Sequence, residues 1–212
     1  MQVHIRELAQ SSNFDLTATK QLNRLNRHVM NICHLHKWPD FRRVDETIDT
    51  VADQEAYTYP ATAGFIFTDI TKIEMKDPED NLYWKSIPMV RTELNWSRLG
   101  REAGGFPDAY LLQDNATVKQ IAFRRNPDFA GTNNVRVTGY VEPTVITSTD
   151  STQFRETALD YILVELVAAD ILDQRVALKA RAKTLFEGAR LKLSKLAGRE
   201  IKPAEIMIEE AA

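Results

Sequence analysis

The stretch HKWPDFRRVDETIDTVADQEAYTYP, residues 36–60, contains the point where the sequence pattern changes from helix to strand. A residue that precedes proline is restricted to extended backbone, so Pro39 predicts that a helix ends at Trp38. Short β-type runs then follow, separated by the turn residues Asp53 and Gln54. The stretch therefore predicts a junction between a helical part of the chain and a β part.

Residues 15–36, before the junction, have the spacing of an amphipathic helix. Apolar side chains recur every three or four residues, with lysine, arginine and asparagine between them. The apolar positions are Leu16, Ala18, Leu22, Leu25, Val29, Ile32 and Cys33. A helix cannot bury such a stripe alone, so another element must cover it.

Residues 44–142, after the junction, alternate with the period of two that is typical of strands. The expected strands are VDETIDTVA (44–52), EAYTYP (55–60), FIFTDITKIEM (65–75), LYWKSIP (82–88), YLLQ (110–113), TVKQIAFRR (117–125) and NVRVTGYVEP (134–143). DPEDN (77–81) predicts a hairpin turn and NPDFAGTNN (126–134) a long turn. MVRTELNWSRL (89–99) predicts a short helix whose buried face is Val90, Leu94 and Leu99.

The C-terminal part of the chain returns to a helical pattern. Residues 154–173 are apolar around most of the helix, which predicts that it is covered on several sides. Residues 176–198 predict a second helix, with Gly198 as its C-cap, because glycine readily adopts left-handed backbone. These two helices are the natural partner for the stripe of the first helix.

We therefore predict an α+β fold in which a β part is inserted into a helical bundle. Residues 1–38 and 150–198 are expected to form the bundle, and residues 39–149 an antiparallel β-sandwich or barrel-like sheet. Residues 199–212 are expected to be a tail that becomes ordered on a partner.

The composition is that of an ordinary globular chain: of 212 residues, 43% are hydrophobic and 27% are charged. No apolar run reaches the roughly 18 residues that a transmembrane helix needs, and the first residues lack the apolar core of a signal peptide. The single cysteine, Cys33, excludes an internal disulfide and favours a reducing compartment.

The net charge of −3 is unevenly distributed along the chain. Residues 175–199 hold eight lysines or arginines and one acid, a net charge of +7, so the rest of the chain carries −10. This distribution favours a surface for an interaction partner over a general nucleic-acid-binding domain.

No group of residues predicts an active site or a metal site, so we expect no enzyme activity, no metal and no cofactor. His34 and His36 are two residues apart and would face opposite sides of a helix, and no acid lies between His28 and His36. We interpret the histidines as solvated side chains at a helix end, and Cys33 as a small buried side chain of the stripe. Phosphate-binding and nucleophile-elbow motifs are absent from the sequence.

The residues by themselves also permit two other functions. Aromatic residues in the β part could make a carbohydrate-binding or glycan-degrading tail protein: Tyr57, Tyr59, Tyr83, Trp84, Trp96 and Tyr110. Lys179, Lys183 and Arg190, expected opposite Leu178, Leu185 and Phe186, could instead form a positively charged wall toward DNA.

The order of the segments resembles the head-to-tail adaptor proteins of tailed bacteriophages, and is similar to the tail tubular protein A type of short-tailed phages. The resemblance covers about residues 15–197. It depends most on WPDF (38–41), QEAYTYP (54–60), FPDAYLL (106–112) and FRETALDYILVELVAADIL (154–172).

This resemblance implies a structural virion protein without a catalytic role. Such adaptors form a ring, typically of about twelve copies, beneath the portal protein at one capsid vertex. The ring extends the DNA channel and carries the attachment surface for the next tail component, a nozzle or tail tube. The implied partners are therefore the portal protein, neighbouring copies, that tail component and genomic DNA in passage, with no membrane and with assembly in the host cytoplasm.

Two sets of residues are expected to make these contacts. Portal or subunit contacts are assigned to Arg175, Lys179, Lys183, Arg190, Lys192, Ile201, Ile206, Met207 and Ile208. Contacts between ring neighbours are assigned to Tyr161, Leu166 and Ile171, because a helix that is apolar on several sides can cover both its own bundle and a neighbour.

Overall fold

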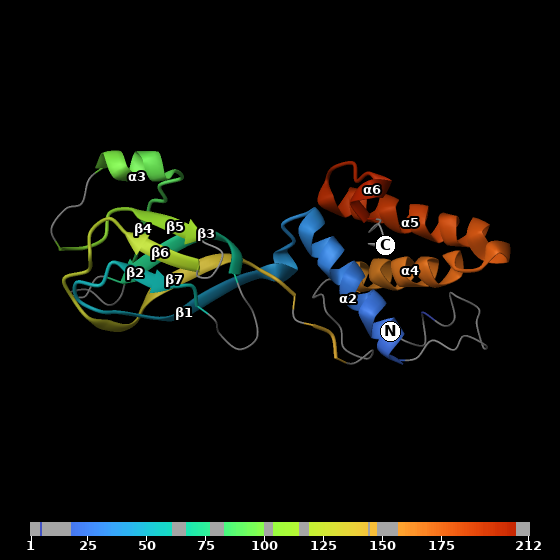
Figure 1. Cartoon of the computed structure of the whole chain (residues 1–212), viewed down its shortest axis with the longest axis horizontal. Helices are drawn as coiled ribbons and strands as arrows, with labels where there is room; N and C mark the ends of the chain where they lie inside the picture. The colour runs from blue at the N-terminus through green and yellow to red at the C-terminus, as the bar shows by residue number, and fades with distance from the viewer. Residues whose placement is uncertain are drawn as a thin grey trace. The chain divides into compact units, whose positions relative to one another are not determined.

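The computed structural model of the protein (Figure 1) describes residue 5 and residues 18–60, 67–76, 83–99, 104–114, 119–143, 145–147 and 157–206. The chain divides into two units, Met1–Phe41 with Pro143–Ala212, and Arg42–Glu142. The described elements of the first unit are helical, and those of the second are strands and one short helix. The α+β class predicted from the sequence is therefore confirmed.

The helical unit joins residues from both ends of the chain in one core. Its elements are α2 (Ala18–Leu35), the 3-10 turn η1 (Pro39–Phe41), α4 (Thr157–Asp173), the 3-10 turn η2 (Val176–Leu178), α5 (Lys179–Ala197) and α6 (Pro203–Ile206). α4 packs against both α2 and α5 (Figure 1). The N-terminal helix thus shares a bundle with a C-terminal helical pair, as predicted.

The apolar patterns explain why these helices pack as they do. α2 buries Leu25, Val29 and Ile32, which lie on one face because they are three or four residues apart. α4 buries Leu163 and Val167 completely, together with residues on its other sides. A helix that is apolar nearly all round is stable only where neighbours cover several of its faces.

Two side-chain hydrogen bonds, one of them from a residue far along the chain, close the C-terminal end of α2. The indole Nε1 of Trp38 donates to the carbonyl oxygen of Ile32 at 2.6 Å, and Arg199 Nη2 donates to the carbonyl oxygen of Leu35 at 2.6 Å. The last carbonyl groups of a helix have no partner within it. Trp38 therefore ends the helix by hydrogen bonding, in addition to the restriction imposed by Pro39.

The chain after α5 folds back onto the bundle. Gly198 ends α5 in the left-handed conformation, with φ of 64°, as predicted for a C-cap. Ile201 and Ile206 are 0% and 1% exposed within the core, and Arg190 Nη1 donates to the carbonyl oxygen of Ile201 at 2.8 Å. The described part of the expected tail, residues 199–206, is thus packed on the bundle of its own chain.

The strands of the second unit form two sheets whose paired strands are antiparallel. They are β1 (Arg42–Thr50), β2 (Ala56–Thr58), β3 (Phe67–Lys76), β4 (Trp84–Ile87), β5 (Tyr110–Asp114), β6 (Lys119–Phe123) and β7 (Gly131–Val141). The strand orders are β1–β7–β3–β4 and β2–β6–β5. Both sheets contribute to one core, as the two inner faces of a sandwich do.

The pairing of β3 with β4 agrees with the hairpin predicted from DPEDN, since Ile73 lies opposite Ile87 in antiparallel register. The turn itself lies outside the described residues. β3 also pairs with β7, where the two backbones approach closely at Gly139. A Cβ at Gly139 would overlap the carbonyl oxygen of Asp69 and would lie 2.9 Å from the ring of Phe67. Only glycine fits this position without displacing the backbone of β3.

Two local predictions in the β unit are wrong. The short helix, α3 (Glu93–Leu99), has no buried residue, and Leu94 and Leu99 are 61% and 44% exposed. These two leucines are five residues apart, so they do not share a helix face. The turn predicted over 126–134 is shorter, because β7 begins at Gly131 and the N–H of Asn133 donates to Asp49 Oδ1 at 2.7 Å.

Candidate functional site

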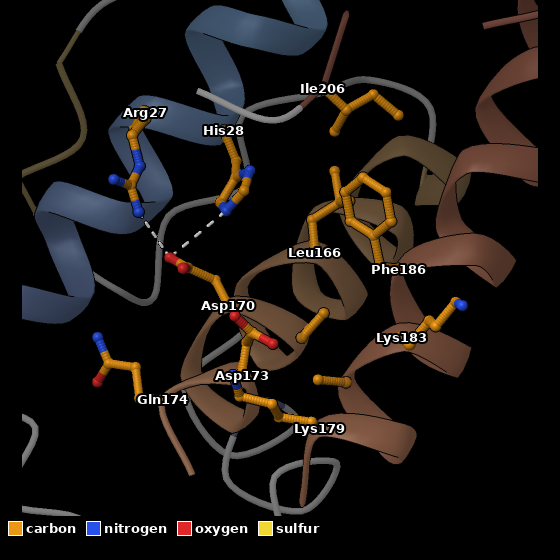
Figure 2. Close-up of a pocket in the computed structure, with 12 residues that line it drawn as sticks. Arg27, His28, Leu166, Asp170, Asp173, Gln174, Lys179, Lys183, Phe186 and Ile206 are labelled. Carbon is orange, nitrogen blue, oxygen red and sulfur yellow. Dashed lines mark hydrogen bonds and ion pairs between the residues drawn. The ribbon is translucent and has the colours of Figure 1, made fainter. Parts of the chain in front are cut away.

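A cluster of charged side chains joins α2 to α4. Arg24, Arg27 and His28 share one face of α2, because they are three or four residues apart. Each of them approaches Asp170 Oδ2 on α4: Arg27 Nη2 lies at 2.7 Å, Arg24 Nη1 at 3.5 Å and His28 Nε2 at 3.7 Å. Figure 2 shows Arg27 and His28 converging on this carboxylate.

The surroundings hold the carboxyl group of Asp170 in its charged form. Burial by itself raises its pKa, but the neighbouring His28 and the charges of Arg24 and Arg27 outweigh burial and lower the pKa below its ordinary value. We did not predict this cluster from the sequence. One feature of the sequence could have revealed it: Asp170 is an acid on a helix that is apolar on nearly all sides. Such a helix is buried, and a buried charge requires a partner.

His28 is buried, with 8% of its surface exposed, so the prediction of solvated histidines is wrong for this residue. The ring atom Nε2 lies 3.7 Å from Asp170 Oδ2, and this neighbouring imidazole helps to lower the pKa of the carboxyl group. His34 is exposed as predicted, while the ring of His36 contacts Trp38 edge-on, with 4.8 Å between centroids.

A cavity of about 620 Å³ lies beside this cluster (Figure 2). It is lined by Arg27, His28, Leu166, Ala169, Asp170, Asp173, Gln174, Lys179, Ala182, Lys183, Phe186 and Ile206. One part of the wall is apolar, formed by Leu166, Phe186 and Ile206. The other part is charged, and it includes Lys179 and Lys183, which are exposed and form no ion pair with another described residue.

The cavity places Lys179, Lys183 and Phe186 on the same face of α5. The prediction that these lysines lie opposite Phe186 is therefore wrong. Residues at positions i, i+4 and i+7 of a helix share a face, so the lysines and the aromatic ring line one wall. A helix with a mixed basic and apolar face does not present the uniform positive wall that the DNA-binding alternative requires.

The remaining basic residues assigned to portal contact lie in different surroundings. Arg175 is exposed at the start of η2. Arg190 is held by its own helix and by the chain that follows, since its Nε donates to Glu187 Oε2 at 2.8 Å and its Nη1 to the carbonyl oxygen of Ile201. Lys192 is exposed but forms an ion pair with Glu165 of α4.

The apolar residues assigned to contacts divide into buried and exposed groups. Leu166, Ile171, Ile201 and Ile206 are at most 1% exposed, so the folded chain already covers them. Tyr161 on α4 is 63% exposed. Met207 and Ile208 lie outside the described residues. Of the three ring-contact residues, only Tyr161 is thus accessible to a neighbour.

No group of three or more histidine, cysteine, aspartate or glutamate side chains within the described ranges could hold a metal ion. Cys33 is partly buried, and it packs against the core of the helical unit. No helix in the described part of the chain is long and apolar enough to cross a lipid bilayer.

In the β unit, FPDAYLL, one of the segments quoted for the resemblance, lies against the strand segment TVKQIAFRR. Arg124, after β6, donates through Nε to Asp108 Oδ1 at 2.8 Å, and its backbone N–H donates to the carbonyl oxygen of Ala109 at 3.0 Å. The hydrogen bond from Arg124 lowers the pKa of Asp108. The contact joins FPDAYLL to TVKQIAFRR, and it explains structurally why an acid precedes β5.

Three of the six aromatic residues named for the carbohydrate alternative take part in packing within the β unit. Tyr57 and Tyr110 are buried in the sandwich core, and burial, with a smaller effect of Asp69, raises the pKa of Tyr110 to about 12. The ring of Trp84 is covered by two cationic groups: Lys76 Nζ lies at 4.7 Å and Arg136 Cζ at 4.1 Å from its centroid. These residues are used in packing, so the geometry gives no support to the carbohydrate-binding alternative.

The fold defines an α+β protein in which a β unit is inserted into a helical bundle formed from both ends of the chain. The family model described as SU10 adaptor protein matches residues 2–204. The chain belongs to this SU10 adaptor family, and it is therefore a head-to-tail adaptor protein of a bacteriophage. The resemblance found in the sequence is confirmed. No curated protein matches the chain.

Proposed function

We propose that this adaptor assembles into a ring beneath the portal protein, extends the channel for the genome and carries the attachment surface for the tail. The observation that supports this proposal is the family match over residues 2–204, nearly the whole chain. The ring contains about twelve copies, as the resemblance implies. The protein assembles in the host cytoplasm, becomes part of the virion at the head–tail junction, and catalyses no reaction there.

The charge distribution suits contacts between copies or with the portal. Residues 175–199 carry a net charge of +7 and the rest of the chain −10, so one copy offers both signs of charge to its partners. Complementary charges on two different surfaces favour head-to-tail contacts, which close into a ring.

The proposal assigns portal or subunit contact to the exposed residues Arg175, Lys179, Lys183 and Lys192, and contact with a ring neighbour to the exposed Tyr161. Met207 and Ile208, which lie outside the described residues, stay in the proposal on their sequence alone. The buried residues Leu166, Ile171, Ile201 and Ile206 are not part of this contact surface, because they would have to leave the core of their own chain. Arg190 acts within the chain by holding Ile201.

A channel protein must let DNA pass without binding it tightly. Each phosphate that a protein neutralises increases the affinity and its dependence on salt. A chain with a net charge of −3 avoids extensive neutralisation of this kind. DNA is accordingly a passing partner of the ring and not a bound ligand.

The proposal is tested by mixing the purified chain with purified portal particles. Native mass spectrometry is expected to show a fixed number of copies per portal, and electron microscopy a ring on one face of the portal only. The chain without portal serves as the control for self-assembly. If no copy binds the portal at any mixing ratio, the proposed function is wrong.

A further inference from the structure

The exposed apolar side chains of the β unit are concentrated in two segments. Among the described residues of this unit, six large hydrophobic side chains are exposed: Val44, Val51, Tyr83, Met89, Leu94 and Leu99. Two of them lie in residues 44–53, the β1 segment, and three in residues 89–99, the α3 segment. Tyr83 belongs to neither, because strand β4 separates it from α3. Exposed apolar residues that gather in patches mark interaction surfaces, whereas scattered ones do not.

The two segments lie at opposite edges of one sheet. The strand order β1–β7–β3–β4 makes β1 one edge strand and β4 the other, and α3 follows β4 in the chain. The chain before α3 is held by β5, since the N–H of Val90 donates to the carbonyl oxygen of Tyr110 at 2.8 Å. Figure 1 shows α3 and β1 on opposite sides of the β unit. One copy therefore carries two different apolar surfaces that cannot cover each other.

The two segments also differ in charge. The β1 segment contains no base and four acids, of which all but the first are exposed: Asp45, Glu46, Asp49 and Asp53. Arg136 offsets one of these charges, because it pairs with Glu46. The α3 segment contains two exposed bases and one acid: Arg91, Arg98 and Glu93. Net charges of −4 and +1 favour contact between the two kinds of segment over contact between two β1 segments.

α3 is too short to be stable through its own hydrogen bonds. It has seven residues and none of them is buried, and isolated helices shorter than about 12 residues are marginal in water. The hydroxyl group of Thr92 caps its first turn by accepting a hydrogen bond from the N–H of Asn95 at 3.2 Å. Leu94 and Arg98 share one face of the helix, because they are four residues apart. A surface with apolar and acidic side chains would complement that face.

The edge at β1 suits contact through side chains more than the addition of another strand. The register of β1 against β7 shifts on both sides of Ile48. Bulges and charged side chains on an edge strand disfavour continuous pairing with a strand of another molecule. A short helix can cover Val44 and Val51 without such pairing.

We propose that the α3 segment of one copy binds the β1 segment of the next copy, with Leu94 against the exposed valines and the two arginines against the acids. Two different surfaces on opposite sides of one unit make a heterologous contact, and such contacts close into a ring. The inference rests on the proposed function, because it supplies a second contact of the same ring, in addition to that of Tyr161. Segments of about ten residues are smaller than the roughly 20–30 residues that each partner gives to a stable interface. The two contacts therefore act together.

Photo-crosslinking in the whole chain tests the proposal. Leu94 is 61% exposed, so p-benzoylphenylalanine is introduced in its place. Irradiation of the portal-bound ring is expected to link this position to residues 44–53 of another copy, as identified by peptide mass spectrometry. Mixing ¹⁵N-labelled and unlabelled copies separates links between copies from links within a copy. The control position is Leu191 on α5, which is 59% exposed and should give no link to that segment. A link within one copy, or a link from Leu94 to any other segment, overturns the proposal.

Charge reversal provides a second readout. Arg91→Glu with Arg98→Glu in the copy that carries the crosslinker is expected to lower the yield of the link about fivefold. Arg91→Lys with Arg98→Lys keeps the charge and is expected to keep the yield. The glutamate changes in the acceptor copy alone should have no effect, because the acceptor contributes only its β1 segment. A loss with the lysine variant overturns the charge pairing, and a loss with the changed acceptor overturns the heterologous contact.

Irradiation with and without the portal protein separates this inference from the proposed function. A ring on the portal without the link overturns the contact and leaves the ring function intact. A link between copies of concentrated free protein that forms no ring supports the contact and contradicts the proposed function. Absence of both ring and link overturns both.

Discussion

Asp170 connects the N-terminal helix to the C-terminal helices through Arg24, Arg27 and His28. We expect Asp170→Asn to lower the free energy of unfolding of the helical unit by about 2 kcal/mol. This is less than the roughly 3–5 kcal/mol for breaking a fully buried pair, because the carboxylate is partly exposed and screened. Urea denaturation followed by circular dichroism measures the change. Asp173→Asn is the control, since Asp173 is exposed and has no hydrogen bond or ion pair to another described residue.

The effect of Asp170→Asn should depend on pH in a defined direction. The pKa of Asp170 is lowered in the folded protein, so its charge stabilises the fold fully above the unfolded pKa of about 3.9. That contribution disappears as the pH falls through the lower folded value. The difference between the two proteins should therefore be constant near neutral pH and shrink below about pH 4. A difference that persists in stronger acid would assign the effect to packing and not to charge.

Two glycines are expected to respond to alanine in opposite directions. Gly139→Ala should destabilise the β unit by about 1–3 kcal/mol or more, because the added methyl group overlaps the backbone of β3 at Asp69. Gly188→Ala should stabilise α5 by up to about 1 kcal/mol, because an added Cβ would meet no atom within 4 Å beyond its chain neighbours and the adjacent backbone of its own helix, and alanine favours helix. Denaturant midpoints of both variants against the wild type measure the difference. Equal effects of the two substitutions would contradict the close approach at Gly139.

α6 provides the test at the level of a single element. The side chain of Ile206 is 1% exposed although the element has only one turn. Ile206→Ala should cost about 2–4 kcal/mol, the usual effect of a cavity in a core. Val176→Ala is the matched control, because Val176 is 86% exposed and should change stability by less than about 0.5 kcal/mol. Thermal unfolding of both variants distinguishes a packed element from a terminal segment that contributes no stability.

Helices and strands could be predicted where their apolar residues recur regularly over a long segment. α2 and α4 have buried faces that follow from their apolar spacing, and the strands of the β unit occur in the predicted order. The prediction failed at α3, whose seven residues are too few to define a buried face by spacing. It also failed for the face of α5, because Phe186 was assigned to the core side and the lysines to the solvent side. Amphipathic spacing does not reveal a cavity that both kinds of side chain can line.

At the scale of the whole molecule, the β unit begins and ends on paired strands. Arg42 of β1 lies opposite Tyr140 of β7. The chain therefore enters and leaves the β unit at neighbouring positions of one sheet. We expect replacement of Arg42–Glu142 by a short glycine–serine linker to leave a folded helical unit. Far-ultraviolet circular dichroism and a cooperative thermal transition would show this. Loss of cooperative unfolding would mean that the helical core depends on the β unit.

Ring assembly offers a comparison between two exposed tyrosines. Tyr161→Ala on α4 should leave the stability of the free protein unchanged, because Tyr161 is 63% exposed. It should lower the yield of the portal-bound ring several-fold, which corresponds to a loss of about 1 kcal/mol of binding free energy at each contact. Tyr83→Ala is the control, because Tyr83 has a similar exposure, 66%, in the β unit. Ring yield is measured by native mass spectrometry. Equal yields for both variants would remove Tyr161 from the proposed ring contact.

The sequence by itself determined the α+β class, the N-terminal helix, the helical pair at the C-terminal end and the family, because each of these depends on apolar periodicity or on the order of segments. Only the tertiary structure decided that His28 is buried beside Asp170, that Ile201 and Ile206 belong to the core, and that Lys179 shares a cavity wall with Phe186. These features depend on residues far apart in the chain. Local spacing specifies which face of an element is apolar, whereas the charges and cavities between elements arise only when those faces meet.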